Sequence, residues 1–193
     1  MQPKELLKFL ARIEPLKSSG RHSVTTGGVT ETVAAHSWRL AVMALLLADE
    51  FPGVDMDKVI KMCLIHDFGE AITGDIPAFV KTQDNESTEE KAIETLLLDL
   101  PERERHGFSA LFEEMEEQAT EEARLYRALD KLEAVIQHNE SDIATWIPLE
   151  YKLNLTYGQE QAAAFPYLKA LREQLRLETE EKIRAAGGGP KDA

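Results

Sequence analysis

Cysteine is almost absent from this chain of 193 residues, which contains only Cys63. A single cysteine excludes an intramolecular disulfide framework and favours a reducing compartment, so we expect a cytoplasmic protein. Long apolar runs are missing as well. The longest nearly uncharged stretch, Leu40 to Ala48, is too short to cross a bilayer, and the first residues lack a basic segment followed by an apolar core. We therefore expect neither export nor membrane association.

Basic residues are in the minority. The sequence contains 22 Lys and Arg and 35 Asp and Glu, which gives a net charge of −13 at pH 7. This balance argues against binding to nucleic acid, because the phosphate backbone would be repelled. The acidic excess is concentrated between Glu86 and Glu122, whereas Met1 to Leu40 is richer in Lys and Arg. An anionic small molecule is therefore expected near the N-terminal third.

The hydrophobic content of 43% supports one sizeable core. We expect a single domain over residues 1–186, with the glycine-rich tail at 187–193 disordered. Apolar residues recur at helical spacing, and no alternating pattern of a strand is present, so the sequence predicts an all-α fold in which residues 21–31 form a loop.

Helix boundaries are indicated by polar residues and prolines. Thr32, Asp55 and Thr120 are expected to cap helices. The helix that follows Thr120 is predicted to reach about Trp146, and one last helix is predicted from about Gln159 to Arg184.

Four residues of metal-binding type interrupt helices that otherwise read as buried: His36, the adjacent pair His66 and Asp67, and Asp130. Burying imidazoles or carboxylates is costly unless they are bound. Two imidazoles and two carboxylates suit one divalent ion, Mn, Co, Fe, Ni, Mg or Zn. Because they fall on three predicted helices, we expect a metal site in the core of a helix bundle, within residues 32–140. Glu70 falls one predicted helical turn after His66.

The order His, His-Asp, Asp resembles that of the HD-domain metal-dependent phosphohydrolases, a helical family, and within it the 5′-deoxynucleotidase and HD domain-containing protein 2 type. The resemblance runs from about Phe9 to Glu140. Its most specific part is HDFGEAITGDIP, residues 66–77, which matches the pattern His-Asp-x-x-Glu-x-x-x-Gly-Asp-[Ile/Leu]. The segment from Leu129 to Glu133 matches as well.

The resemblance implies roles for individual residues. His36, His66, Asp67 and Asp130 match the metal ligands of the family. The implied catalytic residues are Glu70, Asp75 and Arg21, and the implied substrate-binding residues are Arg21, His22, Asp75, Ile76, Pro77 and Ala78. Arg21 matches a phosphate-orienting arginine, whereas His22 stands where the deoxynucleotidases carry a tryptophan. This departure leaves the sugar and base preference open.

The activity implied is metal-dependent removal of the 5′-phosphate from (deoxy)nucleoside monophosphates, which gives the nucleoside and inorganic phosphate. Two alternatives stay open: another nucleotide phosphohydrolase or phosphodiesterase of the superfamily, or a non-catalytic module that binds metal or nucleotide. A purely structural metal site would not need Glu70 and Asp75.

The resemblance also implies a homodimer. The predicted last helix has an apolar face that can serve a second copy or pack on its own core, formed by Phe165, Leu168, Leu171, Leu175 and Leu177.

Overall fold

The computed structural model describes residues 1–188, so the tail predicted at 187–193 lies outside the described residues except for Gly187 and Gly188. The helices are α1 (Pro3–Ile13), α2 (Val33–Leu46), α3 (Met56–Ile65), α4 (Glu70–Thr73), α5 (Gln83–Leu97), α6 (Glu102–Glu117), α7 (Glu121–Glu140), α8 (Glu150–Thr156), α9 (Gln159–Ala163) and α10 (Pro166–Ala185). Two short strands, β1 (Gly20–Val24) and β2 (Thr30–Thr32), and the 3-10 turns η1 (Glu14–Lys17), η2 (Ala48–Glu50) and η3 (Ile143–Thr145) complete the described elements. The predicted helical fold is confirmed.

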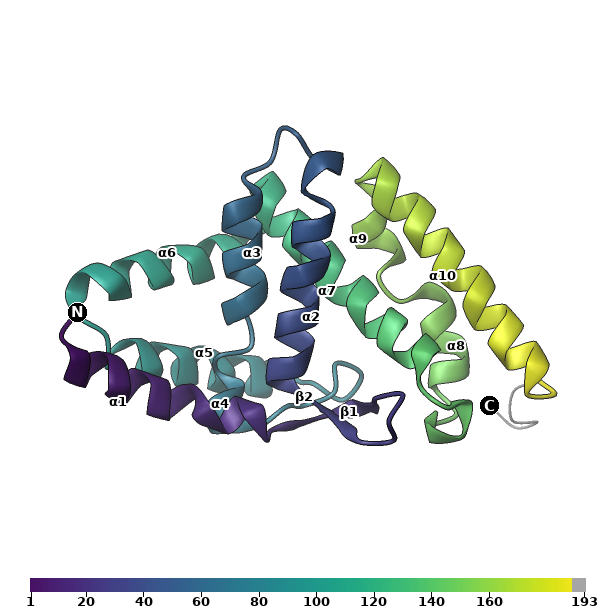
Figure 1. Cartoon of the computed structure of the whole chain (residues 1–193), viewed down its shortest axis with the longest axis horizontal. Helices are drawn as coiled ribbons and strands as arrows, with labels where there is room; N and C mark the ends of the chain where they lie inside the picture. The colour runs from purple at the N-terminus through teal and green to yellow at the C-terminus, as the bar shows by residue number, and fades with distance from the viewer. Residues whose placement is uncertain (189–193) are drawn as a thin grey trace.

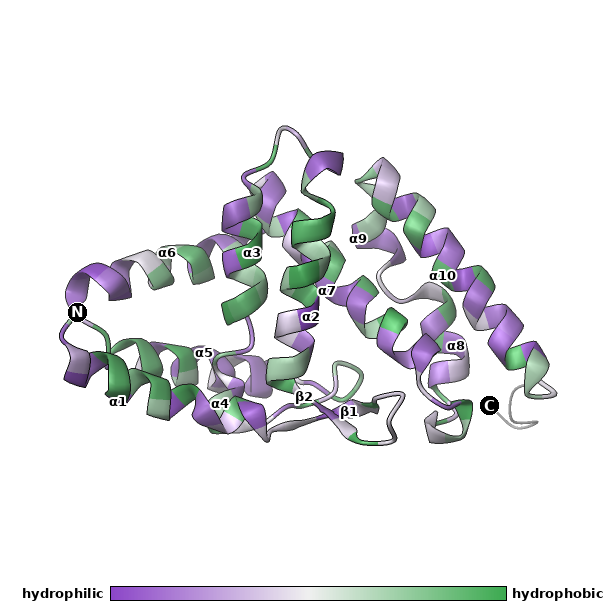
Figure 2. Cartoon of the chain, in the orientation of Figure 1, coloured by the Kyte–Doolittle hydropathy of each residue, from purple (hydrophilic) through white to green (hydrophobic). Residues whose placement is uncertain are grey.

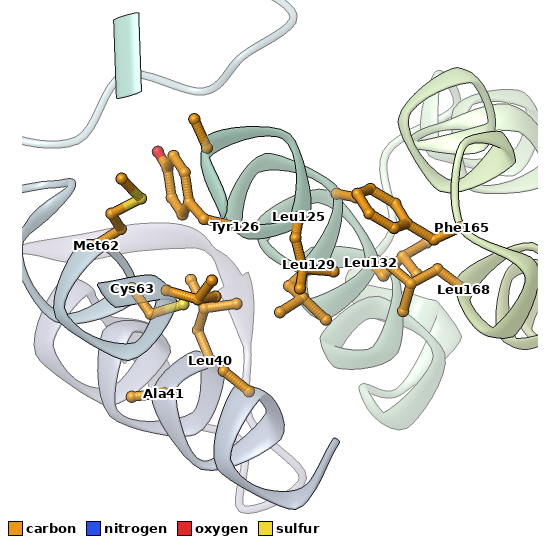
Figure 3. Packing of buried hydrophobic residues seen from close by; sticks show 14 of the residues in the cluster. Leu40, Ala41, Met62, Cys63, Leu125, Tyr126, Leu129, Leu132, Phe165 and Leu168 are labelled. Carbon is orange, nitrogen blue, oxygen red and sulfur yellow. The ribbon is translucent and has the colours of Figure 1, made fainter. Parts of the chain in front are cut away.

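Helices α2, α3 and α7 pack together at the centre, with α1, α5 and α6 on one side and α8, α9 and α10 on the other (Figure 1). The main core joins Leu40 of α2, Cys63 of α3, Leu129 of α7 and Leu168 of α10 (Figure 3). Hydrophobic residues are prominent on α2 and α3, whereas α6 and α10 carry many hydrophilic ones (Figure 2). No helix within residues 1–188 combines the length and apolar character needed to span a membrane.

The three predicted helix caps are confirmed. The side chains of Thr32, Asp55 and Thr120 each accept a hydrogen bond from the backbone N–H three residues later, at 3.2, 3.1 and 3.2 Å. Each bond satisfies a backbone donor that the first turn of a helix leaves without a partner. The caps thereby set the starts of α2, α3 and α7, the helices that meet at the centre.

Residues 21–31 lie largely in a β-hairpin, and the predicted loop is wrong. β1 and β2 run antiparallel, with Gly20 opposite Thr32 and Val24 opposite Thr30. The strands are short and mostly polar, so they lack the alternating apolar pattern that marks a half-buried strand. The Gln137 side-chain amide donates to the carbonyl oxygen of Val24 at 2.8 Å, which ties the hairpin to α7.

Two helix boundaries and the helical placement of Glu70 also differ from the prediction. α3 ends at Ile65, and residues 66–69 form a turn before α4, so Glu70 does not continue the surface of α3. α7 ends at Glu140, where the hydroxyl of Ser141 donates to the carbonyl of Gln137 at 2.7 Å. The last predicted helix is divided into α9 and α10, because Pro166 has no N–H and starts a new helix at its first position.

Candidate active site

The side chains of His36 and His66 meet where α2 approaches the end of α3, with ring centroids 5.4 Å apart. His36 is fully buried. Asp130 of α7 lies between them, with its Oδ1 atom 3.1 Å from Nε2 of His36 and 3.6 Å from Nε2 of His66. Asp67 adds a second carboxylate, its Oδ2 atom lying 3.0 Å from Nε2 of His66. The structure thus brings together all four residues expected to bind metal.

The opposite nitrogen of each imidazole is held by the protein. Nδ1 of His66 lies 3.0 Å from the carbonyl oxygen of Cys63. Nδ1 of His36 makes a short hydrogen bond with Glu133, which is itself buried. Partners of this kind fix the tautomer of an imidazole and leave the lone pair of Nε2 for another ligand.

The cluster attracts positive charge. Burial lowers the pKa of His66, but Asp67 and Asp130 raise it more, and the resulting pKa is about 10. Burial raises the pKa of Asp67, whereas His66 and Arg21 lower it, and the resulting value is about 2. Two carboxylates that stay ionised in a buried place favour any cation that can reach them.

The donor set fits a divalent cation. His36, His66 and Asp67 each offer one ligand atom, and these atoms lie within 4.8 Å of one another. Nε2 of His66 is buried and makes no hydrogen bond within residues 1–188. Mixed imidazole and carboxylate ligands suit first-row divalent metals and Mg.

Glu70 lies beside this cluster, at the start of α4. Its side chain is buried, and Oε2 makes no hydrogen bond with the described residues. Burial, together with the carboxylates of Asp67 and Asp75, raises the pKa of Glu70 to about 9. We call His36, His66, Asp67 and Asp130 the metal-type cluster. A buried carboxyl group next to this cluster is the arrangement expected of a residue that holds or deprotonates water.

Arg21 of β1 connects the cluster with Asp75. Its Nη1 atom lies 3.2 Å from Asp67 and 3.7 Å from Asp75, and its Nε atom lies 3.4 Å from Glu31. These carboxylates raise the pKa of Arg21 although burial opposes them, so the guanidinium is a permanent cation. Arg21 therefore stands at the metal-type cluster, and it is already engaged by three carboxylates.

The chain matches a known family over most of its length. The family model described as HD domain matches residues 13–171. The chain belongs to the HD domain family. Among curated relatives of this HD domain, human 5′-deoxynucleotidase HDDC2 is 31% identical over 195 residues, which cover 97% of this chain and 92% of the relative. The bovine 5′-deoxynucleotidase HDDC2 is 36% identical over 141 residues, 71% of this chain and 68% of the relative.

Solved structures resemble this HD domain as well. A predicted metal-dependent phosphohydrolase from Magnetospirillum magnetotacticum MS-1 is 30% identical, has a TM-score of 0.79, and is matched over 97% of this chain and 98% of its own. A conserved hypothetical protein from Pyrococcus furiosus is 29% identical, with a TM-score of 0.71 over 89% of this chain and 99% of its own. The fold of this HD domain implies a divalent metal, in agreement with the donor set above.

Two cavities adjoin the site of this HD domain. The larger, of about 930 Å³, is lined by Arg21, His66, Asp67, Glu70, Asp75, Ile76, Ala78 and Asp130 among others. The smaller, of about 90 Å³, is lined by His22, Pro77 and Phe79, and shares Arg21, Asp75 and Ala78 with the larger one. The residues expected to bind substrate are therefore divided between two adjoining spaces.

His22 lies in the wall of the smaller cavity, against α8. Its Nε2 atom lies 3.2 Å from Glu150 of α8, and its ring meets Phe79 edge-on with centroids 5.4 Å apart. His138 of α7 approaches the same carboxylate at 3.3 Å. Sequence reasoning assigned no role to Glu150 or His138, because single polar residues on separate elements show no diagnostic spacing.

Glu133 was also missed as a supporting residue. It contacts His36 and accepts a hydrogen bond from Nε of Arg39 at 2.6 Å. Its position offers a signal: it falls three residues after Asp130, on the same face of a largely apolar helix.

Proposed function

We propose that this protein is a metal-dependent phosphomonoesterase that releases the 5′-phosphate of nucleoside monophosphates, with deoxyribonucleotides as the first candidates. One observation carries the proposal: four ligand-type side chains converge next to a buried glutamate and an arginine, at the wall of a large cavity. The relatives named 5′-deoxynucleotidase and a structural neighbour named metal-dependent phosphohydrolase support it.

His36, His66, Asp67 and Asp130 would hold one divalent ion. When bound, such an ion supplies positive charge that polarises the phosphate and favours the carboxylate form of Glu70. Glu70 then positions the attacking water and takes its proton, a contribution of about 10²–10⁴-fold in similar enzymes.

Arg21 orients the phosphate. A guanidinium can make two parallel N–H···O bonds to a phosphate, and phosphate oxygens would compete with Asp67 and Asp75 for its donors. Asp75 lines both cavities, within reach of Arg21, so the oxygen of the leaving group is its expected partner. We assign it to that oxygen, either as proton donor or as hydrogen-bond partner of the sugar.

The test is a substrate panel. The protein is loaded separately with Mg, Mn, Co, Ni or Zn, and phosphate release is measured from ribo- and deoxyribonucleoside mono- and triphosphates. We expect release from monophosphates with at least one metal. Release only from triphosphates or cyclic diesters would favour the other nucleotide hydrolases of the superfamily, and no release from any nucleotide would favour a binding module.

We also propose a homodimer in the cytoplasm. The face of α10 does not supply the dimer contact in this proposal, since Phe165, Leu168 and Leu175 are buried in the core of the chain itself. Exposed apolar residues on α2, Trp38 and Leu45, lie seven residues apart on one face and are better candidates. Light scattering tests the mass, and cell fractionation tests the location.

A further inference from the structure

The smaller cavity contains a polar cluster that the phosphate chemistry above does not use. Glu150 is 1% exposed, and its Oε2 atom accepts a hydrogen bond from the backbone N–H of Ile147 at 2.7 Å. Its Oε1 atom lies 3.2 Å from Nε2 of His22 and 3.3 Å from Nε2 of His138. Neither imidazole is oriented for a hydrogen bond, so this buried oxygen has no hydrogen-bond donor within the described residues.

A second buried polar atom without a partner lies in the same cavity wall. Asn154 is 2% exposed, and its Nδ2 atom makes no hydrogen bond with residues 1–188. Asn154 follows Glu150 by four residues on α8, so both side chains occupy one face of that helix. Leaving buried polar atoms without partners costs about 1–3 kcal/mol each. Such a pair is therefore expected where a ligand completes the hydrogen bonds.

The chemistry of the pair defines its ligand. Glu150 offers an acceptor and Asn154 a donor, and a hydroxyl group matches both, because it can donate one hydrogen bond and accept another. The cavity of about 90 Å³ is only a few times the ~30 Å³ of a water molecule in the liquid. It suits one edge of a sugar ring rather than a whole nucleoside.

The position of the cavity connects it with the reaction. Arg21 and Asp75 line both cavities. A phosphoester whose phosphate is held at Arg21 can therefore extend its alcohol toward Glu150 and Asn154. The Nε2 atoms of His22 and His138 both lie within 3.3 Å of the same carboxylate oxygen of Glu150.

We propose that Glu150 and Asn154 recognise a sugar hydroxyl of the leaving nucleoside, and that the enzyme selects phosphomonoesters whose alcohol carries this second hydroxyl. This inference rests on the proposed nucleotidase function. It assigns substrate selection to α8, outside the metal-type cluster.

The experiment compares two substrates on the same enzyme preparation. 2′-Deoxyadenosine 5′-monophosphate carries the 3′-hydroxyl, and 2′,3′-dideoxyadenosine 5′-monophosphate lacks it. We expect wild-type kcat/KM to favour the first by about 10- to 100-fold, the effect of one hydrogen bond to a charged group. Because the ratio is internal to one preparation, a loss of folded enzyme cancels.

Glu150→Gln is the decisive variant. The amide oxygen can keep the bond to Ile147, while the amide nitrogen places a donor where Oε1 accepts. We expect the ratio to fall to within about 3-fold of one, with a smaller fall for Asn154→Ala. Glu160→Gln, an exposed change on α9, should keep the wild-type ratio.

Each contrary outcome has a distinct meaning. Equal wild-type rates on the two nucleotides would overturn the hydroxyl assignment and leave the nucleotidase function standing. A Glu150→Gln variant that slows both substrates in the same proportion would show a structural role and overturn the assignment as well. If the wild type hydrolyses p-nitrophenyl phosphate but neither nucleotide, the proposed function itself fails, and the inference fails with it.

Discussion

The Nδ1 atom of His66 lies 3.0 Å from the carbonyl oxygen of Cys63, one turn earlier on α3. A backbone carbonyl accepts hydrogen bonds only, so in the neutral imidazole that a metal ion requires, this contact places the proton on Nδ1 and leaves the lone pair on Nε2. The ring of His66 is thus oriented by a backbone carbonyl of α3. The ring of His36 is oriented instead by the side chain of Glu133 from α7.

Glu133→Gln should weaken metal binding. The amide still accepts a hydrogen bond from His36, but it no longer makes the imidazole more basic, and second partners of this kind typically contribute 10- to 100-fold in affinity. Calorimetric titration of the metal-free protein with Mn²⁺ measures the change. Glu140→Gln is the matched control, because Glu140 pairs with the same Arg39 but not with His36. Equal affinities for the two variants would refute the role of Glu133.

Glu70→Gln should separate catalysis from metal binding. We expect phosphate release to fall by about 10²–10⁴-fold, since the amide cannot accept a proton from water. Metal content, measured by plasma mass spectrometry, should stay at the wild-type level. Glu181→Gln, an exposed change on α10, controls for the loss of one negative charge. Retained activity in Glu70→Gln would rule out the mechanism.

His138 should make the protein less stable as the pH falls. Burial lowers its pKa below the ordinary value; Glu150 opposes this shift, and His22 and Arg21 reinforce it. Between the lowered pKa and about 6.5, the unfolded chain binds more protons than the folded one, so the free energy of unfolding decreases as the pH drops through this window.

His138→Gln should remove that part of the pH dependence. Urea unfolding of both proteins between about pH 5 and 7.5 gives the difference, in which contributions of unchanged groups cancel. His106→Gln, at an exposed position on α6, is the control. If the difference in the free energy of unfolding between the two proteins does not change with pH, then His138 does not titrate as its burial requires.

Gly69→Ala should destabilise the turn between α3 and α4. A Cβ atom there would lie 2.7 Å from Cγ of Glu89 and 3.0 Å from its carbonyl oxygen, so α5 would have to move. Overpacking of this kind costs about 1–3 kcal/mol. Gly53→Ala meets no atom within 4 Å and should leave urea unfolding nearly unchanged. Equal stability of the two variants would show that α5 can move to admit the Cβ atom without loss of stability.

The parts of the molecule that could be predicted rest on local signals. Thr32, Asp55 and Thr120 each precede an apolar helix, and capping depends only on residues three positions apart. His36, His66 and Asp130 were noticeable because ionisable side chains rarely stand in apolar helices without a partner. Both kinds of signal can be read without knowing how the chain folds back on itself.

The parts that could not be predicted depend on distant contacts. The hairpin is joined to α7 by Gln137, which lies 113 residues after Val24. The sequence before Glu70 keeps helical spacing, but residues 66–69 form a turn in which Gly69 lies close to Glu89 of α5. Glu150 gains significance only because β1 and α7 bring His22 and His138 to it.

The separation of the two cavities has an evolutionary consequence. The metal-type residues belong to α2, α7 and the turn that follows α3, while Glu150 and Asn154 belong to α8, which contributes none of them. Substitutions in α8 can therefore change which alcohol is accepted while the hydrolytic machinery is inherited intact. A lineage of such proteins could acquire new substrates gradually, without passing through inactive ancestors.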